Sequence, residues 1–223
     1  MVRRLFLLWL CPILVGAAGL AAAGEPGPAF WELLRRARAG DSIAQGELGT
    51  AFYRGKGVTR DLVEAAAWYR RAAAQGDPEG QYGMGLLHLE ATDPDLLPAE
   101  ASRRLSRDQE ALFGFFVPLS ARTGVDPDDR RAAAWFRRAA EGGHPLAQLA
   151  LGRLYARGRG VPRDAGEAYF WLSLALRGAE GEARLRAGEE RRAVAEELSA
   201  YRLDEARGRV RTWRPRPTRG APP

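Results

Sequence analysis

The sequence predicts an all-α fold assembled from repeated pairs of helices, and three observations support this prediction. Alanine and arginine dominate the chain while β-branched residues are sparse, a balance that favours helices over strands. Apolar residues follow a helical spacing, for example at Ala44, Leu48 and Phe52. Short blocks of sequence also recur at regular intervals, which is the signature of a repeat architecture.

The N-terminus has the features of an export signal. Arg3 and Arg4 precede an apolar segment at residues 5–20, and the small residues at 21–23 form a cleavage site. We expect a signal peptide at residues 1–23 and a mature chain that begins at Gly24 in the periplasm. An uncleaved anchor in the inner membrane is the alternative, because residues 5–23 approach the length that spans a bilayer.

The single cysteine, Cys11, lies within this signal segment. The mature chain would therefore contain no disulfide and no cysteine-based metal site, so its stability would come from packing.

The formal net charge of +6 is concentrated near the C-terminus. Six arginines and no acidic residue occur beyond residue 206. Without these six arginines and the leader, the chain has a slightly negative net charge. Nucleic-acid binding, which needs basic residues spread over a folded face, is therefore not predicted. The arginines of this segment are Arg207, Arg209, Arg211, Arg214, Arg216 and Arg219.

Three copies of one pattern extend over residues 40–177. A block containing Gln45 and Gly49 recurs 36 residues later at Gln81 and Gly85, and a third copy follows. In each copy this block is followed by a turn that contains glycine. A further block follows the turn, with tryptophan and alanine at the same positions in every copy. The repeated positions expected to form the core are Leu48, Gly49, Phe52, Gly57, Ala65, Trp68, Ala72, Gly85, Gly124, Trp135, Ala139, Gly152, Tyr155, Gly160, Ala168, Trp171 and Ala175.

Each copy is interpreted as helix, turn, helix. Asp61 and Asp164 stand where a second helix needs an N-cap, and Gly76 and Gly143 stand just beyond second helices. A capping helix is expected within residues 24–39, further capping helices within 178–213, and a disordered Arg/Pro-rich tail at 214–223.

The pattern Ala-Gln-x-x-Leu-Gly, Gly-x-Gly-Val and Ala-x-x-Trp-aromatic resembles the Sel-one-like repeat family, a relative of the tetratricopeptide repeats. The resemblance implies a right-handed α/α solenoid of three repeats that binds a protein or peptide on the concave face of its first helices. It also suggests a non-catalytic adaptor in a Gram-negative envelope. The contacts expected on the first helices are Glu47, Thr50, Leu86, Ala150 and Arg153.

The middle repeat carries an insertion at about residues 90–120. Its apolar end contains Phe113, Phe115 and Phe116, which either pack back on the solenoid as an added helix or form a patch for a partner. The Arg-rich tail either is simply solvated or makes peripheral contact with anionic envelope surfaces.

The sequence contains none of the common catalytic motifs that we sought, and no cofactor or metal is implied. His144 aligns with helix starts, and His88 aligns with core aromatic residues. We therefore predict that the chain is not an enzyme. Two alternatives stay open, a cell-wall-directed hydrolase resembling β-lactamases and an inhibitory regulator of an envelope sensor or enzyme.

Overall fold

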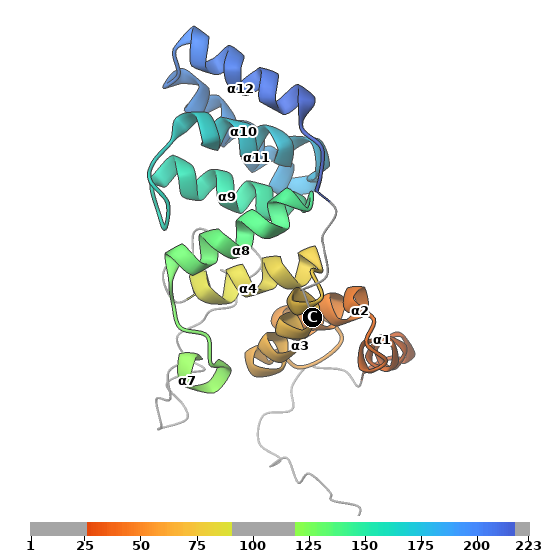
Figure 1. Ribbon diagram of the computed structural model, residues 1–223. Helices are drawn as coiled ribbons and strands as arrows, with labels where there is room; N and C mark the ends of the chain where they lie inside the picture. Colours follow the sequence, from red (N-terminus) through yellow and green to blue (C-terminus); the bar gives the residue numbers. More distant parts are fainter. Residues whose placement is uncertain (1–25, 91–118, 217–223) are drawn as a thin grey trace, which may run out of the picture.

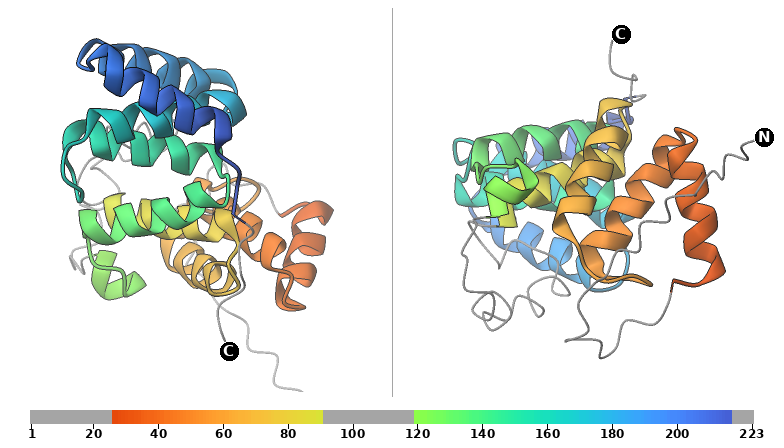
Figure 2. Two further views of the ribbon diagram at one scale, coloured as in Figure 1. Left: turned by 45° about the horizontal axis from the view of Figure 1, so that its top comes forward. Right: turned by 90° about the horizontal axis from the view of Figure 1, so that it is seen from below.

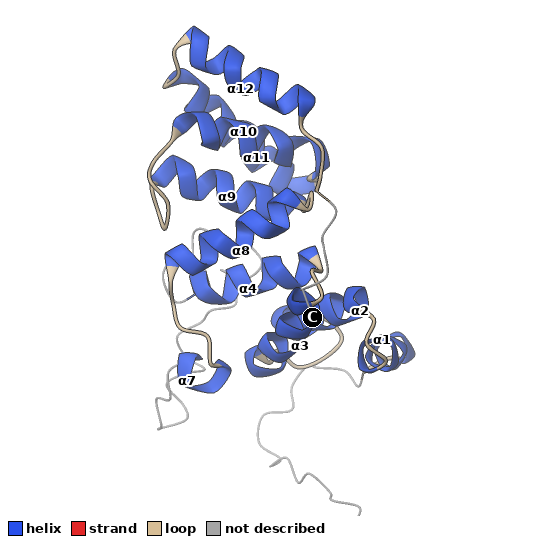
Figure 3. Ribbon diagram, viewed as in Figure 1, coloured by secondary structure: helices blue, strands red, loops and turns tan. Residues whose placement is uncertain are grey.

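The computed structural model describes residues 26–90 and 119–216, which form helices and loops only (Figures 1 and 3). Residues 1–25, 91–118 and 217–223 lie outside the described part, and with them the signal segment and most of the insertion. The described helices are α1 (Pro28–Arg38), α2 (Ser42–Arg54), α3 (Leu62–Ala74), α4 (Pro78–Glu90), α7 (Leu119–Thr123), α8 (Asp129–Glu141), α9 (Pro145–Arg157), α10 (Ala165–Gly178), α11 (Gly181–Glu196) and α12 (Ala200–Thr212).

The helices stack in pairs along the molecule. The pairs are α2 with α3, α4 with α8, and α9 with α10, and each pair also packs on the next through α3 with α4 and α8 with α9. The left view of Figure 2 shows the same succession, from α1 in orange at one end to α12 in blue at the other. The predicted fold class, an all-α solenoid, is confirmed.

Acidic side chains begin the second helices, as the sequence predicted. Asp61 accepts hydrogen bonds from the backbone nitrogens of Val63 and Glu64, and Asp164 caps α10 in the same way. Asp128 does so for α8, where it accepts from the nitrogens of residues 130 and 131 at 2.8 and 3.1 Å. Each cap satisfies otherwise unpaired N–H groups and stabilises its helix by about 1 kcal/mol.

Glycines of the first helices lie directly against large side chains of the second helices. Tyr69, Phe136 and Leu172 are each almost fully buried, at 1%, 0% and 0% exposure. A β-carbon on the facing glycine would come within 2.5–2.7 Å of the side chain, which is too close for any real contact. Only glycine therefore lets the two helices approach this closely. The facing pairs are Gly49 with Tyr69, Gly85 with Phe136, and Gly152 with Leu172.

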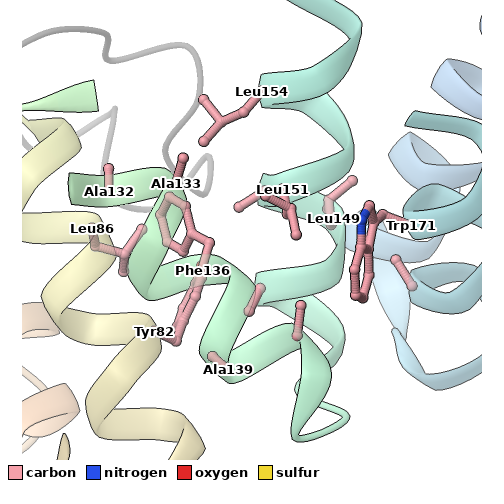
Figure 4. Close-up of a cluster of buried hydrophobic side chains, with 14 of the residues drawn as sticks. Tyr82, Leu86, Ala132, Ala133, Phe136, Ala139, Leu149, Leu151, Leu154 and Trp171 are labelled. Carbon is pink, nitrogen blue, oxygen red and sulfur yellow. The ribbon is translucent and has the colours of Figure 1, made fainter. Parts of the chain in front are cut away.

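These pairs build the main hydrophobic core, part of which is shown in Figure 4. Phe136 lies between α4 and α8, with its ring 5.7 Å from that of Tyr82. The repeated alanines are fully buried beside them and allow the backbones to pack closely. They are Ala65, Ala72, Ala139, Ala168 and Ala175.

The repeated tryptophans differ in burial more than the sequence suggested. Trp68 and Trp171 are 7% and 5% exposed, but Trp135 is only partly buried against the core. The guanidinium groups of Arg71 and Arg138 lie 4.5 and 4.9 Å from the ring centroids of Trp68 and Trp135. The residue after each tryptophan, rather than the tryptophan itself, fills the space against the glycine.

The turn glycines have left-handed backbones. Gly160 has φ +65°, and a β-carbon there would lie 2.0 Å from the carbonyl oxygen of Asp129. This turn therefore presses against the start of α8, which links the third repeat to the second. Gly57 and Gly124 have φ +74° and +64°.

Additional helices cover both ends of the array. On α1, Phe30, Leu33, Leu34 and Ala37 form a small cluster with Leu48 and Trp68. At the other end, α11 packs on α10 and α9, and α12 packs on α10. Ser199 accepts a hydrogen bond from the backbone nitrogen of Arg202 and so caps the start of α12.

The predicted disordered tail begins at residue 214, but the first residues of that segment are packed. The backbone nitrogen of Arg216 donates to the carbonyl of Glu141 at 2.8 Å, and its side chain donates to the Glu141 carboxylate at 3.1 Å. Pro215 lies close to Gly143. The chain therefore returns from α12 to the end of α8.

Candidate functional site

The predicted contacts lie on α2, α4 and α9, whose common surface we call the first-helix face. On α2, Glu47 is exposed and Thr50 is half-buried. Ile43, which the sequence analysis did not select, is 59% exposed one helical turn before Glu47. Ile43, Glu47 and Thr50 therefore form an open stripe on α2, one apolar residue beside two polar ones.

Leu86 is not available as a contact. It is 3% exposed and belongs to the main core, where Figure 4 shows it between α4 and α8 beside Phe136. Gly85 lets α4 and α8 approach closely, and the neighbouring Leu86 is buried between these two helices. The expectation that Leu86 faces a partner is wrong for this structure.

Ala150 and Arg153 are also buried, at 7% and 6% exposure. They lie on α9, against which α11 packs. A side-chain nitrogen of Arg153 lies 2.9 Å from a carboxylate oxygen of Glu190 on α11. Helix α11 therefore covers the surface of the third repeat that the sequence predicted to be open.

The other predicted contacts, Phe113, Phe115 and Phe116, lie outside the described residues.

A row of polar side chains connects the three repeats across the first-helix face. The hydroxyl of Thr50 donates to a carboxylate oxygen of Glu79 at 2.5 Å and lies 3.1 Å from the hydroxyl of Tyr69. The other carboxylate oxygen of Glu79 is 2.8 Å from Nε2 of His144. We call Thr50, Tyr69, Glu79 and His144 the polar row.

His144 has a structural role at both ring nitrogens. Its Nδ1 accepts the backbone N–H of Ala147 and so caps α9, which confirms the helix-start interpretation. Its Nε2 faces Glu79, and its ring stacks on Tyr82 with centroids 4.7 Å apart. Because Nδ1 accepts, Nε2 carries the proton and donates to the carboxylate.

The carboxylates of this region have shifted pKa values. Burial raises the pKa of Glu79, but the hydrogen bonds from His144 and Thr50 outweigh it and leave the pKa below its usual value. Glu79 is therefore ionised at neutral pH. For Asp77, which caps α4, burial dominates and raises the pKa.

The histidine of the polar row is not placed to activate a hydroxyl group. A histidine that acts as a base accepts the proton of a catalytic hydroxyl at one of its ring nitrogens. Here the Thr50 hydroxyl contacts the Glu79 carboxylate, while Nδ1 of His144 accepts the N–H of Ala147 and Nε2 faces Glu79. The other histidine, His88, is 5% exposed, with Nδ1 2.6 Å from the carbonyl oxygen of Asp126.

Across residues 26–90 and 119–216, no group of three or more histidine, cysteine or acidic side chains is placed to hold a metal ion. In the same part of the chain, no helix has both the length and the hydrophobicity needed to cross a membrane.

Comparisons with known proteins agree with this architecture. The family model for the Sel1 repeat matches residues 42–77, 120–144 and 145–178, which correspond to α2 with α3, α7 with α8, and α9 with α10. An uncharacterized protein of Neisseria meningitidis serogroup B is 30% identical over 110 residues. That match covers 48% of this chain and only 23% of the relative, so the chain spans about a quarter of that protein's length.

Two solved structures are also similar. A Sel1 repeat protein from Oxalobacter formigenes is 28% identical with a TM-score of 0.47, and the match covers 72% of this chain and 98% of that one. A protective antigen with an SLR fold from uropathogenic Escherichia coli is 24% identical with a TM-score of 0.37, covering 83% and 48%.

Stacked helix pairs, in which a glycine of the first helix lies against a large side chain of the second, define the chain as an α-solenoid repeat protein. The family model then specifies the kind of repeat, and the chain is a member of the Sel1 repeat family. Proteins built from these repeats generally act as scaffolds for protein–protein interaction and are typically not enzymes.

Proposed function

We propose that this chain is an exported, non-catalytic adaptor of the bacterial cell envelope that holds a protein or peptide on the first-helix face. The open stripe of Ile43, Glu47 and Thr50 on α2 is the place where we expect the partner to bind. Export rests on the N-terminal segment described above, and the family supplies the general role of a scaffold.

The exposure of Ile43 is the observation that carries the proposal. An aliphatic side chain that is 59% exposed beside a carboxylate offers a partner both apolar area and a charge. On α9 the corresponding surface is closed by α11, so the open part of the face is confined to the N-terminal side. This restricts the contact to a short stretch of the partner.

The polar row supports a structural role for its ionisable groups. Glu79 and His144 join the first helices of successive repeats and leave neither group without a partner. A scaffold benefits from such bonds because they fix the spacing of the helices that a partner reads.

Site-specific photocrosslinking in cells tests the proposal. A benzoylphenylalanine residue at position 43 should give a reproducible crosslink to one protein, and an added Glu47→Arg substitution should abolish it. The matched control is Leu185 on α11, which is also an exposed aliphatic residue, at 68%. Equal crosslinking from both positions would contradict a specific site on α2.

Turnover assays separate this proposal from the hydrolase. Purified protein should leave both nitrocefin and peptidoglycan unchanged, whereas measurable turnover would favour the enzyme. If the crosslinked protein is a sensor or an enzyme whose activity falls on binding, the chain acts as an inhibitory regulator. N-terminal sequencing from the periplasmic fraction should begin at Gly24, and an intact Met1 in the membrane fraction would indicate an anchor instead.

A further inference from the structure

The two C-terminal helices leave a pocket between them. Both α11 and α12 rest on α10 rather than on each other, and Figure 1 shows the three helices at one end of the molecule. The resulting pocket has a volume of about 470 Å³, within the range of small-molecule sites. Its floor is α10, and its walls are α11 and α12.

Among the residues that the structure describes, the lining of this pocket contains no acidic side chain and five arginines: Arg177, Arg184, Arg191, Arg207 and Arg211. Arg207 has a carboxylate partner in Asp204 at 3.2 Å, and that aspartate is itself largely exposed. For the other four, no carboxylate of the described residues lies within 4.0 Å. The pocket therefore concentrates positive charge that the protein does not neutralise.

A second pocket shows that a high arginine content alone does not produce this imbalance. It has a volume of about 680 Å³ and is also rich in arginine. There, however, Arg209 pairs with Glu167 at 2.7 Å and Arg216 pairs with Glu141 at 3.1 Å.

Contacts within the protein position two of these guanidinium groups. The guanidinium carbon of Arg191 on α11 lies 5.9 Å from the centroid of the Tyr169 ring, which belongs to the floor of the pocket. Arg177 on α10 donates to the backbone carbonyl of Val210 on α12 at 2.9 Å. Two arginines from different helices are thus held before any ligand arrives.

Ser173 adds an unsatisfied polar group to the same floor. It is 6% exposed, and its hydroxyl has no hydrogen-bond partner among the described residues. A buried hydroxyl without a partner costs free energy, so an acceptor or donor bound in the pocket would relieve that cost. This observation is independent of the charge and points to a ligand with polar oxygens.

We propose that the pocket between α10, α11 and α12 binds a molecule that carries two or more phosphate groups. Guanidinium groups bind phosphate oxygens through paired, charge-assisted hydrogen bonds. Several phosphates are required because one could neutralise only part of the charge of five arginines. The ligand is either a soluble phosphorylated compound or the phosphorylated headgroup of a lipid.

Calorimetric titration of the full chain, purified in a non-ionic detergent, tests this proposal. Sodium tripolyphosphate at low salt should bind with one ligand per chain. A water-soluble, short-chain phosphatidylinositol bisphosphate is the second probe. Tighter binding of the lipid would assign the site to a headgroup, and equal or tighter binding of tripolyphosphate would assign it to a soluble compound.

Two double variants with equal loss of charge separate a built site from diffuse attraction. Arg184→Gln/Arg211→Gln removes two pocket arginines and should weaken tripolyphosphate binding by about tenfold or more. Arg130→Gln/Arg192→Gln removes two exposed arginines outside the pocket and should change binding by less than about twofold. Circular dichroism should show the same helical content in both variants.

Ser173→Ala supplies a test that does not alter the charge. Loss of the hydroxyl should weaken binding several-fold if it contacts the ligand, about the effect of one hydrogen bond. The proposal is overturned if neither probe binds saturably. It is equally overturned if the two double variants weaken binding to the same extent.

Discussion

Replacing Gly85 by alanine tests the packing that defines the repeat. The new β-carbon would lie 2.5, 2.6 and 3.0 Å from three ring atoms of Phe136, whereas carbon atoms normally pack at about 3.5–4.0 Å. The ring or the helix must therefore move by about 1 Å. Phe136 is fully buried and also packs on Tyr82, so little space exists for this movement.

The magnitude follows from two opposing effects. Overpacking a well-filled core costs about 1–3 kcal/mol. Alanine is favoured over glycine in a helix by about 0.5–1 kcal/mol, which offsets part of this cost. We expect Gly85→Ala to lower the free energy of unfolding by about 1–2 kcal/mol.

Gly188→Ala in α11 is the matched control. Its β-carbon would meet only Leu176, at an ordinary distance of 3.7 Å, so the helix preference should act alone and stabilise the protein. Urea unfolding followed by circular dichroism and by tryptophan fluorescence measures both variants, and coincident transitions would justify a two-state treatment. If Gly85→Ala stabilised the protein as Gly188→Ala does, the argument from close packing would be wrong.

A double-mutant cycle separates the clash from other effects of the alanine. The third repeat places Leu172 over Gly152, which suggests that a smaller side chain can occupy the same slot. Phe136→Leu should therefore reduce the cost of Gly85→Ala, giving a double variant more stable than the sum of the single changes predicts. Strict additivity would show that the ring is not the cause.

Three further predictions concern caps and charges. Asp128→Ala should lower the free energy of unfolding by about 1 kcal/mol in urea titrations, because it removes the N-cap of α8. The pKa of Glu79 is lowered in the folded state, so its contribution is present above the unfolded pKa near 4.5 and is lost as the pH falls through the folded pKa. Glu79→Gln should therefore flatten the pH dependence of stability on the acid side. Arg153→Ala should cost about 1–3 kcal/mol, because it removes a buried side chain and its ion pair with Glu190, which keeps the charges of Arg157 and Arg186 nearby.

Each of these predictions has a comparison that could contradict it. Asp204→Ala on α12 changes an exposed aspartate that pairs with Arg207 on the surface, and it should cost little. An equal loss from Asp128→Ala would remove the argument for capping. If Glu79→Gln lost stability at acid pH as the unmodified protein does, His144 would not be stabilising the Glu79 carboxylate. Full recovery in Arg153→Ala/Glu190→Gln would support the ion pair, and none would contradict it.

The sequence predicted the repeated helix pairs because their signals are local. Asp61 and Asp164 begin helices wherever an acceptor must bind free N–H groups, and Gly160 occupies a left-handed turn that few other residues tolerate. The cap formed by His144 was also predicted from its alignment with aspartates. Such features depend on a few neighbouring residues and therefore recur at the same place in each repeat.

The choice of core side chain depended on the tertiary structure. Sequence reasoning chose Trp135 because it recurs, yet Phe136 is the residue that enters the space beside Gly85. The two residues are neighbours on α8, and the packing of α8 against α4 decides which of them is buried. Leu86 on α4 is buried in the same core.

The open surface was likewise decided by parts of the chain that lie far apart. Residue spacing placed Ala150 and Arg153 on the same face as Glu47, which is correct for the helices alone. The docking of α11 then closed that face at α9, and the divergence of α11 and α12 gathered distant arginines around one pocket. Helix period and caps are properties of a short segment, so the sequence determined them by itself. Exposure depends on which segment covers which, so only the packing of the whole chain determined it.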